Sequence, residues 1–249
     1  MSDPAGRRIV VAGDVSERTL REEIRSRART LGLSGWVRVM DDGTLCVHAE
    51  GDSSALQQLV SSLQSSVAVD SVSERPVRVE GHEQFAIRGE PAGQFVVQEH
   101  QARAHHFDFR LEVDGAMRSW AVPKGPSLDP TVKRLAVEVE VHELAHNEFE
   151  GPTGGGAVII WDRGRYEQGG RVPWPEALDR GHAVFVLHGT KLNGGFALQR
   201  TRGGDKPQWL LIKRRDEHAR AGSDVVSERP ESVKSGMTLD ELADRDRRR

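Results

Sequence analysis

Eight short β-rich runs between residues 94 and 214, separated by glycine, proline and aspartate, constrain the fold most strongly. Many short strands with such turn signals are typical of a β-sandwich or a small barrel. We therefore expect a mainly β domain over residues 94–215. The runs are 95–97, 106–113, 118–122, 135–141, 157–161, 183–187, 196–201 and 209–213.

The first 80 residues have a different pattern, which predicts the order β-α-β-β-α-β. Leu20, Ile24 and Ala28 have the spacing of one buried helix face. Asp42 and Gly43 form a typical hairpin turn between two strand-like runs. This order indicates a ferredoxin-like domain over residues 1–80, followed by a linker over 81–93. The fold class is therefore α+β, with the mainly β domain second.

The end of the chain, residues 216–249, is charged and poor in aromatic residues. Such composition favours disorder, because too little apolar surface can be buried. We expect a disordered tail with a short helix at 238–243.

Composition limits the possible partners and compartments. The formal net charge of -3 means that nucleic-acid binding would need a local basic patch. The single cysteine, Cys46, excludes an internal disulfide framework and a cysteine-rich zinc site, and it is expected to be a buried strand residue. The sequence shows no long apolar run and no signal peptide, so we expect a soluble cytoplasmic protein without membrane contact.

The most chemically informative run is 106–110. Because side chains two residues apart in a strand share a face, His106, Asp108 and Arg110 should point one way, and Phe107 and Phe109 the other. Two possible metal ligands then lie beside a fixed cation. This combination suits a divalent metal together with an anionic oxygen group such as a phosphate ester.

More possible ligands flank this run. His100 precedes it, and six of the ten histidines fall between residues 82 and 146. Residues 135–142 also alternate, which predicts that the valines form one face, and Glu138, Glu140 and His142 the other. Imidazoles and carboxylates together are a common ligand set for divalent transition metals.

Longer motifs of this region resemble the phosphoesterase module of bacterial DNA ligase D, which is also found as a stand-alone protein. The resemblance extends from about residue 85 to 243. Its matching motifs are residues 95–98, 100, 106–112, 119–130, 133–137, 142, 149–151, 161–164 and 209–213.

The resemblance implies a compact, manganese-dependent β-barrel enzyme that heals 3′ ends in DNA repair. Such enzymes remove a 3′-terminal ribonucleoside and then the 3′-phosphate, leaving a 3′-OH. The implied substrates are DNA or RNA/DNA 3′ ends at primer–template junctions, and the implied partner is a separate ATP-dependent DNA ligase or a polymerase. Other divalent transition metals could replace Mn²⁺.

The resemblance also assigns roles to residues. His100, His106 and Asp108 would hold the metal, and Arg110 and His142 would contact the scissile phosphate. Gln98 would support the site, and Lys124 and Arg134 would add positive charge. His142 is also a candidate general acid for the leaving oxygen.

The chain departs from the family pattern at Glu99, His105 and His146, and in a short loop after Gly151. These changes leave the implied metal ligands intact and alter the surrounding pocket wall. We expect His105 and His146 to have packing or solvent-facing roles.

The first domain resembles an acylphosphatase through residues 31–38, 42–44 and 49–51. That family binds phosphate with a glycine-containing loop and an arginine, and orients water with an asparagine. The arginine position is Arg21, the asparagine position is Val39, and the loop 15–19 lacks glycine. Because anion binding by backbone amides needs permissive backbone angles, we expect a structural or partner-binding domain without acylphosphatase activity.

Two alternatives to the phosphoesterase remain. One is a non-catalytic module that binds 3′ ends or recruits a ligase. The other is a non-heme iron oxygenase, because His106, Asp108 and His142 imitate its facial triad. The phosphoesterase motifs argue against the oxygenase.

Overall fold

The computed structural model describes residues 3–14, 18–101, 104–153 and 156–247. The chain divides into two compact units. The N-terminal unit comprises Met1–Glu90 and Gly170–Pro173, and the barrel unit comprises Pro91–Gly169 and Trp174–Arg249. No helix among the described residues has the length and apolar character needed to cross a membrane.

The N-terminal unit has the expected β-α-β-β-α-β order with one further strand. Its sheet has the strand order β4-β1-β3-β2-β5, and β5 runs parallel to β2. Because β5 lies within residues 81–93, part of the expected linker is a strand of this unit. The elements are β1 (Ala5–Gly13), α1 (Arg18–Thr30), β2 (Ser34–Val39), β3 (Leu45–Gly51), α2 (Ser53–Gln64), β4 (Val69–Val77) and β5 (Phe85–Arg88).

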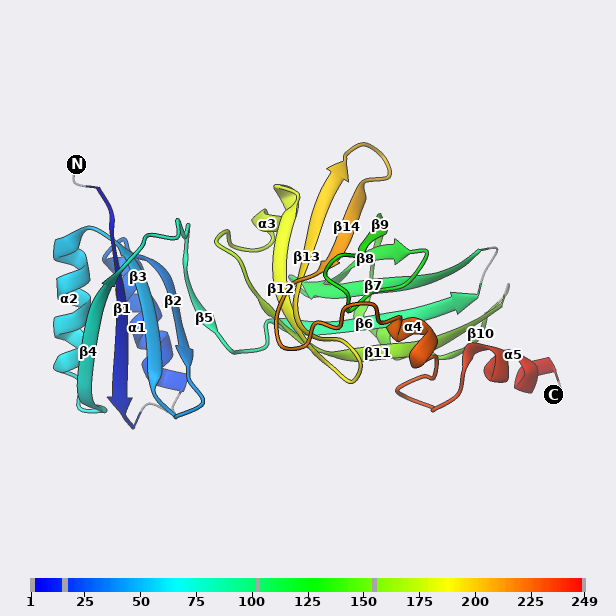
Figure 1. Ribbon diagram of the computed structural model, residues 1–249, viewed down its shortest axis with the longest axis horizontal. Coiled ribbons are helices and arrows are strands. Elements are labelled where there is room, and N and C mark those ends of the chain that lie inside the picture. Colours follow the sequence, from blue (N-terminus) through cyan, green and yellow to red (C-terminus); the bar gives the residue numbers. More distant parts are fainter. Residues whose placement is uncertain (1–2, 15–17, 102–103, 154–155, 248–249) are drawn as a thin grey trace. The chain divides into compact units, whose positions relative to one another are not determined.

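Both helices lie on one face of this sheet (Figure 1). Leu20, Ile24 and Ala28 of α1 are buried in one cluster with the apolar side chains of α2 and with Ile9 and Val11 of β1. Asp52 caps α2 by accepting a hydrogen bond from the Ser54 amide at 2.8 Å. The sheet residues that alternate with Ile9 and Val11 therefore point to the face without helices.

The second unit confirms the prediction of a mainly β domain. Of the two architectures that the sequence allowed, it is the barrel and not the sandwich. Within the described residues, eight antiparallel strands form a closed ring in the order β11-β12-β13-β14-β9-β8-β7-β6, which the β6–β11 pairing completes. The strands are β6 (Gly93–Gln101), β7 (His105–Val113), β8 (Ala116–Val122), β9 (Lys133–His142), β11 (Gly156–Gln168), β12 (His182–Gly189), β13 (Asn193–Arg202) and β14 (Gln208–Lys213), with β10 (Gly151–Thr153), the 3₁₀ helix η1 (Leu144–Glu148) and the helix α3 (Glu176–Asp179) at the periphery.

Aromatic side chains fill the barrel. Phe109 of β7 stacks on Phe185 of β12 with ring centroids 5.8 Å apart, and Trp120 of β8 contacts Trp209 of β14 at 6.0 Å. Neither pair lies on neighbouring strands, so these rings meet across the interior. The residues that alternate with Phe109, including Asp108 and Arg110, must face outward.

The prediction of a disordered tail is wrong for the described residues 216–247. This segment contains α4 (Val225–Glu228) and α5 (Leu239–Arg247), the latter over the expected helix at 238–243. The Trp161 indole donates to the Arg229 carbonyl at 2.8 Å, and Leu239 packs with Ala157 and Ile159. The composition is polar on average, but a few apolar contacts and backbone hydrogen bonds are enough to hold the segment against the barrel.

Candidate metal and phosphate site

The two histidines and the aspartate of the predicted ligand set meet on the outer face of β6 and β7. The strand register pairs His100 with His106 and Gln98 with Asp108. Residues directly opposite in an antiparallel pair share a face, so His100 and Gln98 of β6 lie beside His106 and Asp108 of β7. One ligand atom each from His100, His106 and Asp108 lies within 4.8 Å of the other two.

Hydrogen bonding orients His106 for a cation. Its Nδ1 donates to the Ala104 carbonyl at 2.9 Å, so Nε2, which faces Asp108 Oδ1 at 3.5 Å, is the nitrogen that can take up either a proton or a metal ion. The hydrogen bond with Asp108 raises the pKa of His106. An acceptor nitrogen opposite a carboxylate is favourable only with a positive charge between them, which either a proton or a metal ion supplies.

The other two ligands are held in the forms that bind metal. Burial and the neighbouring His106 lower the pKa of His100, which favours the neutral imidazole. For Asp108, burial acts to raise the pKa, but the hydrogen bond from His106 and the charge of Arg110 outweigh it and lower the pKa. Two neutral imidazole nitrogens and a carboxylate fit a divalent transition metal.

Arg110 is fixed beside this ligand set by three side chains. Its guanidinium donates to Asp108 Oδ2 at 3.0 Å, to Gln98 Oε1 at 3.2 Å and to Ser119 Oγ at 2.9 Å. Gln98 is itself held, because its amide donates to the Phe149 carbonyl at 3.0 Å. A guanidinium has five N–H donors, so donors remain for an anionic oxygen.

His142 reaches this face through a β-bulge, and not through the alternation that the sequence suggests. The register pairs Trp120 with Glu138 and Ser119 with Val139, then shifts by one residue so that Met117 pairs with His142. Glu138 therefore lies on the side of Trp120, where it accepts from the Trp209 indole at 2.9 Å. The prediction that Glu138 shares a face with His142 is wrong, because the bulge changes the face within β9.

The two other predicted cations lie in different surroundings. Lys124 is exposed in the turn after β8, two residues beyond Val122, which pairs with Phe107. It therefore lies at the end of the sheet that carries His106. Val137 pairs with Ala121, which in turn pairs with Asp108, so Val137 lies on the face of the site. Arg134 pairs with Leu211 and lies three residues before Val137 in the same strand, so its side chain points to the opposite face and does not join the site.

Ser119 and the Phe149 carbonyl are site components that the sequence reasoning missed. Ser119 lies inside a recognised motif, and its place opposite Arg110 in the β7–β8 register is the signal that could have identified it. No sequence pattern identifies a backbone carbonyl such as that of Phe149.

Two departures from the family pattern pair with each other. His105 Nε2 lies 2.7 Å from Glu99 Oε1, and Glu99 is only 9% exposed. Burial raises the pKa of Glu99, although the hydrogen bond from His105 opposes this. These residues alternate with the ligand residues, so the pair lies on the opposite side of the sheet. The side chain of His146 lies outside the described residues.

The corresponding phosphate-binding positions of the N-terminal unit are engaged differently. Arg21 forms an ion pair with Glu90 at 2.8 Å, so a carboxylate of the chain already occupies the predicted anion-binding arginine. Val39 packs against the apolar core. Residues 15–17 of the loop lie outside the described residues.

Comparison with known families divides the chain at the same place. Residues 98–200 match the family described as the DNA Ligase D 3′-phosphoesterase domain, and residues 7–87 match the acylphosphatase family. An acylphosphatase of Thermotoga maritima is 36% identical over 84 residues, which cover 32% of this chain and 93% of that protein.

Relatives of the barrel unit are much longer proteins. The multifunctional non-homologous end joining protein LigD of Pseudomonas aeruginosa is 49% identical over 154 residues, which cover 58% of this chain and 18% of that protein. The Mycobacterium tuberculosis non-homologous end joining DNA repair protein LigD is 41% identical over 128 residues, 49% of this chain and 16% of that protein. The chain thus spans less than a fifth of the length of these relatives.

Solved acylphosphatases match the N-terminal unit. The Bacillus subtilis enzyme is 33% identical, covering 33% of this chain and 97% of that chain with a TM-score of 0.32. The Coxiella burnetii enzyme is 27% identical, covering 34% of this chain and 94% of that chain with a TM-score of 0.33.

Proposed function

Since the chain belongs to the acylphosphatase family through its N-terminal unit and carries a DNA ligase D 3′-phosphoesterase domain in its barrel, we propose that the barrel is a metal-dependent 3′-end phosphoesterase. It removes a 3′-terminal ribonucleoside, a 3′-phosphate or both, and leaves a 3′-OH. The similarity to LigD proteins supports a role in end-joining DNA repair, beside a separate ligase or polymerase.

One observation carries this proposal. His100, His106 and Asp108 converge on the face where Arg110 donates to Asp108 and retains unused donors. A metal-ligand set alone is consistent with many functions. The adjacent guanidinium adds recognition of a tetrahedral anion, which is what a phosphate ester presents.

We assign His100, His106 and Asp108 as ligands of Mn²⁺ or a related divalent ion. Such an ion, when bound, stabilises developing negative charge and lowers the pKa of a water molecule. Arg110 binds the non-bridging phosphoryl oxygens, and Gln98 and Ser119 hold its guanidinium plane in one orientation. Preorganised donors of this kind favour the transition state, because they need not reorient during reaction.

Two further residues complete the proposed site. His142, brought to this face by the β9 bulge, contacts the scissile phosphate and donates a proton to the leaving oxygen. Lys124, exposed at the end of the sheet, attracts the nucleic-acid backbone. We propose that the N-terminal unit lacks acylphosphatase activity, because Glu90 pairs with Arg21 and Val39 replaces the water-orienting asparagine.

The test is an end-processing assay on a 5′-labelled primer–template with a 3′-phosphate or a single 3′-terminal ribonucleotide. Release of phosphate or nucleoside with Mn²⁺, and none with chelator, is the expected result. His182→Ala serves as the control, because His182 of β12 bonds Gln199 of β13 and is not one of the proposed site residues. Ends that are bound but never processed would refute the enzyme and support the end-binding module.

A further inference from the structure

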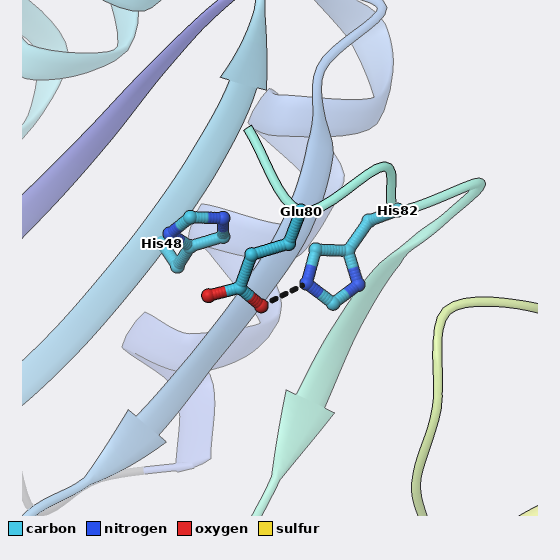
Figure 2. A group of neighbouring side chains, drawn as sticks. All are labelled: His48, Glu80 and His82. Carbon is cyan, nitrogen blue, oxygen red and sulfur yellow. Dashed lines mark hydrogen bonds and ion pairs between the residues drawn. The ribbon is translucent and has the colours of Figure 1, made fainter. Parts of the chain in front are cut away.

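The face of the N-terminal sheet that lacks helices carries a second group of possible metal ligands. A ring nitrogen of His48, a ring nitrogen of His82 and a carboxylate oxygen of Glu80 lie within 4.8 Å of one another. Figure 2 shows the Glu80 carboxylate between the two imidazole rings. His48 comes from β3, and the other two from the segment between β4 and β5.

The segment that carries Glu80 and His82 is anchored over the sheet by a fourth residue. Glu50 is 3% exposed and accepts hydrogen bonds from the backbone amides of residues 80, 81 and 82, at 2.5, 3.0 and 3.0 Å. Glu50 follows His48 by two residues on β3, so both point to the same face. The position of the two loop ligands is therefore set by the sheet.

Glu50 also determines which nitrogen of His48 is available. His48 Nε2 lies 2.7 Å from Glu50 Oε1. The Glu50 carboxylate already accepts three backbone N–H groups, and it accepts from His48 as well. Nε2 of His48 therefore carries the proton, and Nδ1 carries the lone pair. A carboxylate that fixes the tautomer of a histidine in this way is a common support of metal sites.

The Nδ1 atom of His48 gives an independent sign of a ligand. His48 is fully buried, and its Nδ1 has no hydrogen-bond partner among the described residues. A buried nitrogen lone pair without a donor is unfavourable. A metal ion beside Glu80 and His82 would satisfy it.

The spacing of the other two groups fits the same ion. His82 Nε2 lies 3.1 Å from Glu80 Oε2. Ligand atoms at about 2.0–2.1 Å from a tetrahedral zinc ion lie about 3.3 Å apart, so this pair is close to the required spacing.

We propose that His48, Glu80 and His82 form a divalent transition-metal site in the N-terminal unit, of the type that zinc occupies, with Glu50 as the support of His48. Two imidazoles and one carboxylate leave a fourth tetrahedral position for water or a ligand. The Glu80 side chain is 44% exposed, so that position is accessible from solvent. The site links β3 to the segment that precedes β5.

The experiment uses the full chain with His106→Ala and Asp108→Ala, so that the proposed barrel site cannot hold metal. Titration with Zn²⁺ by calorimetry, and with Co²⁺ by visible absorption, should show one remaining equivalent with tetrahedral cobalt bands. Absence of that equivalent would overturn the proposal. The result does not depend on whether the barrel processes 3′ ends.

Variants in this background locate the ion. His82→Ala and Glu80→Gln lie on the segment over the sheet, and each should abolish the remaining equivalent. Glu50→Gln should weaken it by about 10–100-fold, as expected for loss of a supporting carboxylate. Glu74→Gln, at a residue that pairs with Arg7 elsewhere on the sheet, is the matched control and should leave binding unchanged.

Unchanged zinc affinity in folded His82→Ala would contradict the assignment, and circular dichroism verifies the fold of each variant. His82→Ala placed in the otherwise native chain should leave 3′-end processing within twofold of the native rate. A larger loss of 3′-end processing in this variant would contradict a metal site that is independent of the barrel, if added Zn²⁺ did not restore the rate.

Discussion

The two units each bring two imidazoles and a carboxylate within 4.8 Å, but their surroundings differ. In the barrel, the ligand carboxylate Asp108 is held by Arg110, which keeps donors for an anion. In the N-terminal unit, the support is a second carboxylate, Glu50, on His48. We therefore propose different tasks for similar ligand atoms: a metal ion with a phosphate ester in the barrel, and a metal ion without an adjacent arginine for phosphate in the N-terminal unit.

The arginines of the two units show the same contrast. Arg110 of the barrel is oriented by Asp108, Gln98 and Ser119, with donors to spare. Arg21, at the phosphate-binding position of the acylphosphatase fold, is paired with Glu90. An arginine can thus stand at the expected position of a fold and still be engaged by a carboxylate of the same chain, so function must be argued from the site.

The largest expected effect comes from removing a barrel ligand. His106→Ala or Asp108→Ala should abolish Mn²⁺-dependent phosphate release, because the remaining ligands cannot hold the metal in place. The measurement is product formation on a 3′-phosphate primer–template, with His182→Ala as control. Substantial turnover in either variant would contradict the metal assignment in the barrel, and with it the proposed difference between the two units.

Arg110→Ala should have the next largest effect. Loss of a preorganised donor to the phosphoryl group typically lowers kcat by about 10²–10³-fold, whereas manganese affinity should change much less. Steady-state kinetics and manganese titration separate the two effects. If Arg110→Ala weakened metal binding as strongly as turnover, Arg110 would be a support of Asp108 alone.

Asp216→Asn tests whether the barrel can be weakened separately from the N-terminal unit. Lys213 has a fully buried side chain, and its Nζ lies 2.6 Å from both Asp216 carboxylate oxygens. Removing one partner of a buried ion pair costs about 3–5 kcal/mol of unfolding free energy. Hydrogen exchange should show the loss in β13 and β14, and an equal loss in β1 and β3 would contradict the separation.

The same pair predicts a pH dependence of the barrel. Burial acts to raise the pKa of Asp216, but the hydrogen bond and charge of Lys213 outweigh it and lower the pKa below its ordinary value of 3.8. Its stabilisation is therefore present above about pH 4 and is lost as the pH falls through the lowered value. Acid unfolding followed by tryptophan fluorescence should show a smaller loss of stability with falling pH in Asp216→Asn than in the native chain.

The smallest effect is expected at Arg21, the position of the N-terminal unit that corresponds to the phosphate-binding arginine of acylphosphatases. Glu90→Gln releases Arg21 from its ion pair, but Val39 still cannot orient water. Hydrolysis of an acyl phosphate such as benzoyl phosphate should stay at the uncatalysed rate in the native chain and in this variant. Enzymatic hydrolysis by either chain would show that the N-terminal unit has retained the activity.

The local part of the barrel site followed from the sequence by itself. The alternation of residues 106–110 determines that His106, Asp108 and Arg110 share a face, because the two-residue period belongs to a single strand. The eight β-rich runs likewise indicated the barrel strands. The prediction of a disordered tail from average composition was wrong, because a few contacts such as those of Leu239 are enough to order the segment.

Only the tertiary structure decided which distant residues join each site. Strand register places His100 opposite His106 and Ser119 opposite Arg110. A one-residue bulge, which no alternation pattern reveals, brings His142 to that face. The N-terminal ligand group joins His48 to residues of another segment through the Glu50 hydrogen bonds. Local periodicity determines the direction of side chains within one strand, whereas pairing between strands depends on burial of the whole core.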